Sequence, residues 1–139
     1  MITDIKRATE IYICDKLAAE LPTHRCVPFT GGSNTLDADL VEPPFTVVII
    51  SEAQRTHSTE GTWFLRGTVQ VITHAADVGS AEHSTLVRNV YKAFGAIEPD
   101  WSNPLFSLHG IDIDKMRSAE DSESQAHSDI IDFTAGVGG

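Results

Sequence analysis

The sequence predicts an α+β fold, a small mixed or antiparallel sheet of about four strands with two helices packed on one face. Three observations support this prediction. Two segments repeat apolar residues every three or four positions, as one face of a helix requires. Residues 62–73 alternate between two sets of side chains, which is the period of a strand. The predicted elements follow the order helix, two strands, helix, two strands.

The first predicted helix covers residues 3–21. Thr3 is the predicted N-cap, Asp4 favours the positive end of the helix dipole, and Pro22 ends the helix. Its apolar face consists of Ile5, Ala8, Ile11, Tyr12, Cys14, Leu17, Ala18 and Leu21. Residues 22–44 are rich in proline and glycine, which predicts a long connector with one short extended piece around residues 25–29.

Residues 45–51 (FTVVIIS) are rich in β-branched side chains and predict a central strand. A polar turn at 54–61 separates this strand from the alternating segment 62–73. Because the turn is short, the two strands are expected to pair as an antiparallel hairpin. The alternation places Arg66, Thr68 and Gln70 together on the wetter face of that hairpin.

The second predicted helix begins after the N-cap Ser80 and has Gly95 as its C-terminal stop. Residues 105–113 and 128–134 predict the third and fourth strands. We expect flexible loops near 54–61 and 115–127 and a frayed tail at 135–139. The apolar face of this helix consists of Leu86, Val87, Val90, Tyr91, Phe94 and Ile97.

Length and composition fit one globular domain spanning residues 1–139, with a core large enough to fold unaided. The 41% of hydrophobic residues excludes a wholly disordered chain. Cys14 and Cys26 are the only cysteines and no apolar leader precedes them, so neither secretion nor a disulfide framework is indicated. The longest apolar run, residues 47–50, is far shorter than the ~20 residues of a membrane helix, so no membrane contact is expected.

Charge excludes one class of partner. Aspartate and glutamate outnumber lysine and arginine by 20 to 10, which argues against a general basic surface for nucleic acid. Residues 98–139 alone hold nine acidic and two basic residues. This acidity predicts either solvated loops or an assembly surface that must not hold DNA.

No catalytic, cofactor or metal site is expected. His74, Asp77 and His83 lie close together around the start of the second helix, but no pair of histidines has the i, i+4 spacing of a helical metal site. His83 is therefore expected to pack under the helix. Cys14 falls on an apolar helix face and is expected in the core, whereas Cys26 lies in the connector and could be reactive.

Two further groups of residues are weak as catalytic candidates. On a strand, His109 would face away from Asp112 and Asp114, so these three would not share a site. The paired acids are better explained by an exposed strand end than by acid/base chemistry. The glycines of the connector lack the lysine and following helix of a phosphate-binding loop.

A longer pattern begins at Trp63, in WFLRGTVQVITHAADVGSAEHSTLVRNVYKAF. An alternating strand leads into Thr-His-Ala-Ala-Asp, and a helix then opens with Ala-Glu-His and carries Leu-Val-x-x-Val-Tyr. This pattern resembles the tail terminator (tail completion) proteins and related minor tail or neck proteins of long-tailed bacteriophages. The first helix, the proline-rich connector, the hairpin and the closing segments LFSLHGIDID and HSDIIDFTAGV fit the same layout over most of the chain.

The resemblance implies a structural virion protein of the tail or neck, assembled in the host cytoplasm, with no enzymatic activity and no cofactor. Its subunits would form a homo-oligomeric ring, expected to be a hexamer, that caps the tail tube protein and contacts the head-tail connector proteins. DNA would pass through without specific binding.

Unpaired strand edges suit such assembly, since they are templates for a neighbouring chain. The hairpin, residues 45–73, is the region expected to build the ring, and the acidic loop could line the lumen. The predicted assembly interface is Trp63, Arg66, Thr68, Gln70, Glu120, Asp121 and Glu123.

Two alternatives come from other functional classes. The chain could be a small acidic adaptor or inhibitor that mimics nucleic acid. It could also be a metal-dependent enzyme that uses His74, Asp77 and His83.

Overall fold

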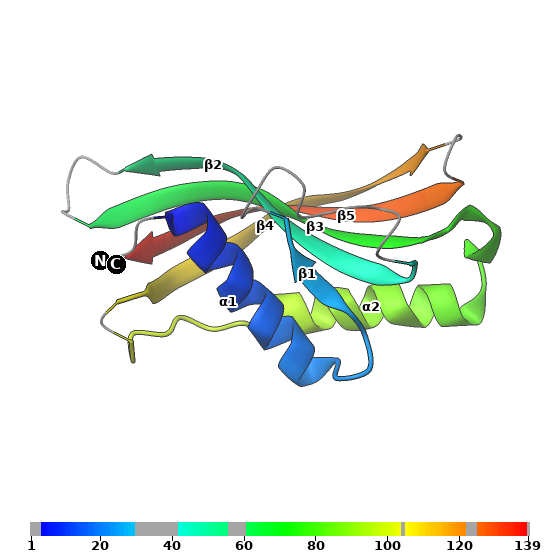
Figure 1. The fold of residues 1–139 in the computed structure, drawn as a ribbon, viewed down its shortest axis with the longest axis horizontal. Coiled ribbons are helices and arrows are strands. Elements are labelled where there is room, and N and C mark those ends of the chain that lie inside the picture. Colours follow the sequence, from blue (N-terminus) through cyan, green and yellow to red (C-terminus); the bar gives the residue numbers. More distant parts are fainter. Residues whose placement is uncertain (1–3, 30–41, 56–60, 104, 122–124, 139) are drawn as a thin grey trace.

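The computed structural model describes residues 4–29, 42–55, 61–103, 105–121 and 125–138. It confirms the predicted α+β fold, with a mixed sheet of five strands and both helices packed on one face (Figure 1). The elements are α1 (Ile5–Glu20), β1 (Cys26–Pro28), β2 (Phe45–Arg55), β3 (Thr62–His74), the 3-10 turn η1 (Ala75–Asp77), α2 (Ala81–Gly95), β4 (Ser107–Asp121) and β5 (Ala126–Gly138).

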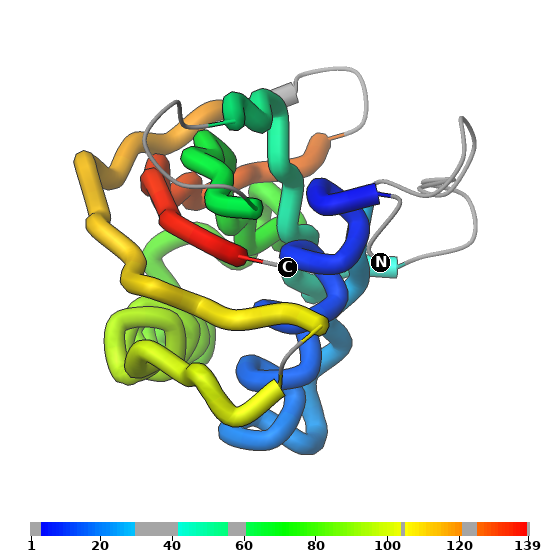
Figure 2. Tube along the Cα trace, turned by 90° about the vertical axis from the view of Figure 1, so that its left-hand side faces the viewer, coloured from blue at the N-terminus to red at the C-terminus, as the bar shows by residue number. Residues whose placement is uncertain are grey.

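The strand order in the sheet is β1-β2-β3-β5-β4. The predicted antiparallel hairpin of β2 and β3 is confirmed, and the additional strand is β1, the short extended piece, which runs parallel to β2. In Figure 2, β4 (yellow to orange) runs along the outside of the molecule on one side and α1 (blue) lies on the other. No helix in the described part of the chain is long and apolar enough to cross a membrane.

The N-cap of α1 lies one residue later than predicted. Asp4 has an extended backbone and its side chain accepts a hydrogen bond from the Arg7 N–H at 3.1 Å, so Asp4 is the N-cap and the prediction of Thr3 is wrong. A carboxylate at this position also complements the helix dipole. Thr3 itself lies outside the described residues.

One buried contact of α1 was not predicted from the sequence. Glu10 is fully buried, and its Oε2 accepts a hydrogen bond from the backbone N–H of Ile50 at 2.8 Å. That N–H lies at a register shift of β2, between Ile50 and Glu52, where β1 no longer pairs with the strand. A buried N–H left without an acceptor is costly, so this hydrogen bond fastens α1 to β2 at the irregularity.

The helix α2 agrees closely with its prediction. Ser80 Oγ accepts from the His83 N–H at 3.1 Å, and the helix ends at Gly95. Phe94 is fully buried against Phe133 of β5, with ring centroids 4.9 Å apart in an edge-to-face arrangement. Tyr91, in contrast, was expected on the apolar face but remains 39% exposed.

The last two strands are longer than predicted. β4 runs on to Asp121 and β5 starts at Ala126, so the described residues of the segment predicted as a loop at 115–127 are strand, except for the turn residue Gln125. The predicted fraying of 135–138 is also wrong, because β5 pairs with β3 over its whole length and Val137 is fully buried. The second half of β4 is exposed on both faces, and it therefore lacks the alternation that marks a strand.

Candidate assembly surface

The sheet offers an open backbone edge along β4. An isolated bridge joins Asp100 to Leu108 and covers only the start of the strand. Beyond it, no residue in the described ranges pairs with the outer side of 110–121. Unpaired N–H and C=O groups in such a row are a template for another strand.

The direction of these groups follows from the register. Leu108 exchanges two backbone hydrogen bonds of 2.9 Å with Asp100, so its polar groups face outward. Residues of an antiparallel ladder alternate between facing their partner and facing away. When this alternation is followed along β4 through its pairing with β5, the backbone N–H groups of Met116 and Ser118 point outward from the edge of the sheet.

A second open edge lies on the opposite side of the sheet. β1 pairs only with the stretch of β2 from Thr46 to Val48, and no described residue pairs with the outer side of 51–55. The outward N–H of Ile50 is already bound by Glu10. Because the register shift between Ile50 and Glu52 moves the alternation by one residue, Ala53 is the next residue with an outward N–H. Within the described residues, the sheet therefore has two edge segments without a paired strand, one on each side.

The predicted interface residues of the hairpin fall on both faces of the sheet. Arg66, Thr68 and Gln70 share the helix-free face, where Gln70 Nε2 donates to Thr68 Oγ1 at 3.1 Å. Arg66 Nε lies 3.9 Å from Glu52 Oε2 with both side chains largely exposed, so this ion pair contributes little to stability. Trp63 points to the opposite face, where it packs against the core, and cannot belong to the same surface.

Among the acidic residues of the predicted interface, Glu120 lies on the other face of the sheet. Glu120 pairs with His127 across the β4–β5 ladder, on the face that the helices cover. Asp121 ends β4, and Glu123 lies outside the described residues.

A charged contact that the sequence analysis missed crosses the helix-free face. Arg117 of β4 donates from Nε to Asp132 Oδ2 of β5 at 2.7 Å, and from Nη2 to Oδ1 at 3.3 Å. The hydrogen bonds to Asp132 raise the pKa of the Arg117 guanidinium. Two parallel bonds hold both side chains in one geometry, so the face next to the β4 edge is polar and ordered. Only the register brings these two residues together.

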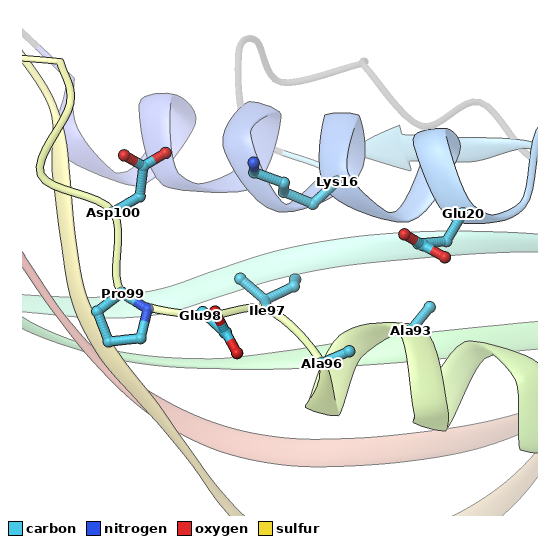
Figure 3. A pocket seen from close by; sticks show the side chains of 8 residues that line it. All are labelled: Lys16, Glu20, Ala93, Ala96, Ile97, Glu98, Pro99 and Asp100. Carbon is cyan, nitrogen blue, oxygen red and sulfur yellow. The ribbon is translucent and has the colours of Figure 1, made fainter.

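A pocket lies between α1 and the segment that follows α2 (Figure 3). Lys16 points toward Asp100, while the carboxylates of Glu20 and Glu98 lie apart from it and from each other. Charged groups spread in this way do not form an acid/base pair or a metal site. The remaining lining residues are Ala93, Ala96, Ile97 and Pro99.

Asp100 beside this pocket has a structural role. Hydrogen bonds from the side chain and backbone of Ser102, together with one from Tyr12, hold the pKa of its carboxyl at about 2. Burial and the 3.0 Å hydrogen bond to Asp100 raise the pKa of Tyr12 to about 12. The hydrogen bond ties α1 to the segment that bridges to β4.

Neither thiol is poised for chemistry. Cys14 is buried in the core as predicted, and burial raises its pKa to about 12. Cys26 was considered as a reactive residue, but burial raises its pKa to about 11, which leaves little thiolate at neutral pH. Both cysteines are free.

The structure does not bring together the three residues considered for a metal. His74 follows Thr73 on β3, and because Thr73 faces His83, the side chain of His74 points to the other face. Asp77 is exposed in η1. His83 instead meets His127 and Asp129 of β5, the one group of three possible ligands whose atoms converge within the described residues.

Similarity to known proteins is limited to the fold. No family model matches this chain, and no curated protein sequence matches it. Among solved structures, a chain in the virion of a native gene transfer agent particle superposes with a TM-score of 0.53 at 18% sequence identity. The match covers 96% of this chain and 92% of that chain, so it involves the whole α+β arrangement.

Proposed function

We propose that this chain is a structural subunit of a phage-like virion and, more specifically, a tail terminator. It forms a ring of its own copies that caps the tail tube and joins it to the head connector. The observation that carries this proposal is the pair of open strand edges on opposite sides of the sheet. The similarity in fold to a chain of a gene transfer agent virion supports the virion role. The tail position rests on the resemblance of the segment that begins at Trp63.

Two different edges on one subunit favour a head-to-tail contact. In the proposed ring, residues 114–120 of one copy pair with residues 51–55 of the next. Such a heterologous contact, repeated around an axis, closes into a ring when the rotation per subunit divides a full turn. Six subunits are expected from the family resemblance.

The edges also carry features that limit pairing with wrong partners. β4 has two register shifts, and Lys115 and Arg117 lie within its open part. Bulges and basic side chains on edge strands suppress indiscriminate aggregation. We infer that the ring contact requires an edge of matching shape and charge, which the next copy supplies.

The proposed role is structural rather than catalytic. The separated carboxylates of the pocket at α1 and the raised pKa values of both thiols support this choice. The formal net charge of −10 supports a ring through which DNA passes without specific binding.

Met116→Pro is expected to abolish ring formation and leave the fold intact. Proline is tolerated on an edge strand where the N–H faces outward, but it removes a donor that the neighbouring strand needs. The loss should weaken each contact by at least about tenfold, and a closed ring multiplies that loss over all its contacts. Light scattering during size exclusion would measure the change, with the protein alone and mixed with its tube protein.

Met116→Val is the matched control, because it keeps the N–H and a side chain suited to a strand. This variant should form rings as the wild type does. Rings that persist in Met116→Pro, while circular dichroism shows a folded protein, would exclude pairing through β4.

The terminator role has its own test in whole particles. Particles produced from a genome that lacks the gene for this protein should show tails of uncontrolled length, or unjoined heads and tails, in electron micrographs. The wild-type gene supplied in trans should restore normal particles, and the Met116→Pro gene should not. Normal, infectious particles without the gene would refute the role whatever the oligomeric state of the protein.

A further inference from the structure

Two histidines and an aspartate converge where the first turn of α2 packs on β5. Asp129 Oδ2 lies 3.0 Å from His83 Nε2 and 3.1 Å from His127 Nε2. The three ligand atoms all lie within 4.8 Å of one another. We propose that His83, His127 and Asp129 form a binding site for Zn²⁺ that clamps α2 to β5.

The local structure fixes all three residues. His127 and Asp129 are two positions apart on β5 and therefore point to the same face, the one covered by the helices. His83 lies in the first turn of α2, where the N-cap Ser80 accepts a hydrogen bond from its N–H. The ligands are thus carried by a strand and a helix end rather than by loops.

The ligand set and its spacing suit zinc. Two imidazoles and one carboxylate are common protein ligands of zinc, and a fourth position is then left for water. With zinc–ligand bonds of 2.0–2.1 Å, ligand atoms of a tetrahedral site lie about 3.3 Å apart. The two distances to Asp129 Oδ2 are slightly shorter than this value, so small side-chain rotations would admit the ion.

Two buried polar atoms in this cluster are poorly paired, although Asp129 Oδ2 lies close to a nitrogen of both rings. Asp129 Oδ2 and His127 Nδ1 have no partner of good geometry among the described residues. His127 is only 7% exposed, so water does not readily replace a missing partner. A buried carboxylate oxygen without a well-aligned donor is costly, and a cation held between it and the two neighbouring rings would satisfy it.

A second layer of side chains holds the three ligands. Thr73 Oγ1 lies 3.2 Å from His83 Nδ1, and Ser118 Oγ donates to Asp129 Oδ1 at 2.9 Å. Glu120 Oε1 lies 3.4 Å from His127 Nδ1, and its exposed side chain can shorten this distance by rotation. Polar groups on the outer atoms of metal ligands fix ring orientation and raise ligand basicity.

Charge and access are both compatible with a cation. The N-terminus of α2 carries a partial positive charge that opposes a metal ion. The carboxylates of Asp129 and Glu120, together with Glu82 in the first turn of the helix, offset it. His83 also borders a surface groove, which gives an ion a path from solvent, lined by Ser84, Val87, Arg88, Tyr91 and Met116.

Zinc binding to the full chain, freed of metal by a chelator, tests the proposal. Titration of Zn²⁺ against a competing chromophoric indicator should give one ion per chain. Asp129→Asn keeps the shape of the side chain but removes its charge, and should weaken binding by more than about 100-fold, beyond the range of outer-layer changes. Thr73→Val should weaken it about tenfold. Co²⁺ should give the visible absorption of a four- or five-coordinate site.

His74→Ala is the matched control. This histidine lies on the neighbouring strand but faces away from the cluster, so its removal should leave zinc affinity unchanged. The site does not exist if the wild type shows no saturable binding, if Asp129→Asn binds as tightly as the wild type, or if His74→Ala weakens binding equally. These measurements use the isolated chain, so their failure would leave the proposed ring unaffected.

Discussion

Phe94→Ala is expected to lower the free energy of unfolding by about 3 to 5 kcal/mol, which is the usual cost of removing a fully buried phenylalanine. Phe94 is the buried ring of α2 and meets Phe133 of β5 edge to face. Its loss removes this ring contact and leaves a cavity between helix and sheet. Since a domain of this kind is stable by only about 5 to 15 kcal/mol, the variant should be close to unfolding. Urea denaturation followed by circular dichroism measures the change.

Tyr91→Ala on the same helix is the control. Tyr91 is an aromatic residue of similar size but is 39% exposed, so its removal should cost clearly less than that of Phe94. Equal losses for the two variants would show that α2 does not pack on the sheet through Phe94.

Gly67→Ala is expected to destabilise the fold by about 3 kcal/mol or more, at the upper end of the range for overpacked cores. A Cβ at this position would lie 2.4 Å from the backbone oxygen of Ile49 and 2.8 Å from Cδ1 of Ile50. The first of these atoms belongs to the neighbouring strand and cannot move without opening the pairing of β2 with β3. Thermal and urea unfolding of the purified variant would measure the loss.

The matched control is Gly110→Ala, another strand glycine, around which a Cβ would meet no atom within 4 Å. This substitution should be neutral or stabilise the protein by up to about 1 kcal/mol, because alanine restricts the unfolded chain. If Gly67→Ala were as harmless as Gly110→Ala, the β2–β3 register around Gly67 would be wrong.

The parts of the fold that were predictable are those with a local cause. Ser80 caps α2 by accepting a hydrogen bond from the N–H of His83, only three residues away. Buried and more exposed residues alternate along β3 because only one face of the strand is covered. The second half of β4 has no such local signal. Arg117 and Ser118 are exposed, and what makes this segment a strand is the match of their side chains to Asp132 and Asp129 across the ladder. The sequence alone does not reveal that pairing.

The candidate sites follow the same division. Arg66, Thr68 and Gln70 were predicted on one face because they are two positions apart on a strand, and the register places them there. The histidine cluster was not predicted, because His83 and His127 are far apart in the sequence. They meet only because β5 pairs with β3 and sets His127 opposite Thr73. Spacing within one helix cannot detect ligands brought together by a sheet.

The buried carboxylate of Glu10 has a consequence for the proposed ring. It binds the backbone of Ile50 where β2 shifts its register, immediately before the free segment 51–55. That segment stays paired with β3, and its direction at the edge of the sheet depends on the contact of α1 with the register shift. In a head-to-tail ring this direction determines the curvature and hence the number of copies that close the circle. A substitution at Glu10, whose side chain is buried inside the subunit, would then change the diameter of the channel of the proposed ring.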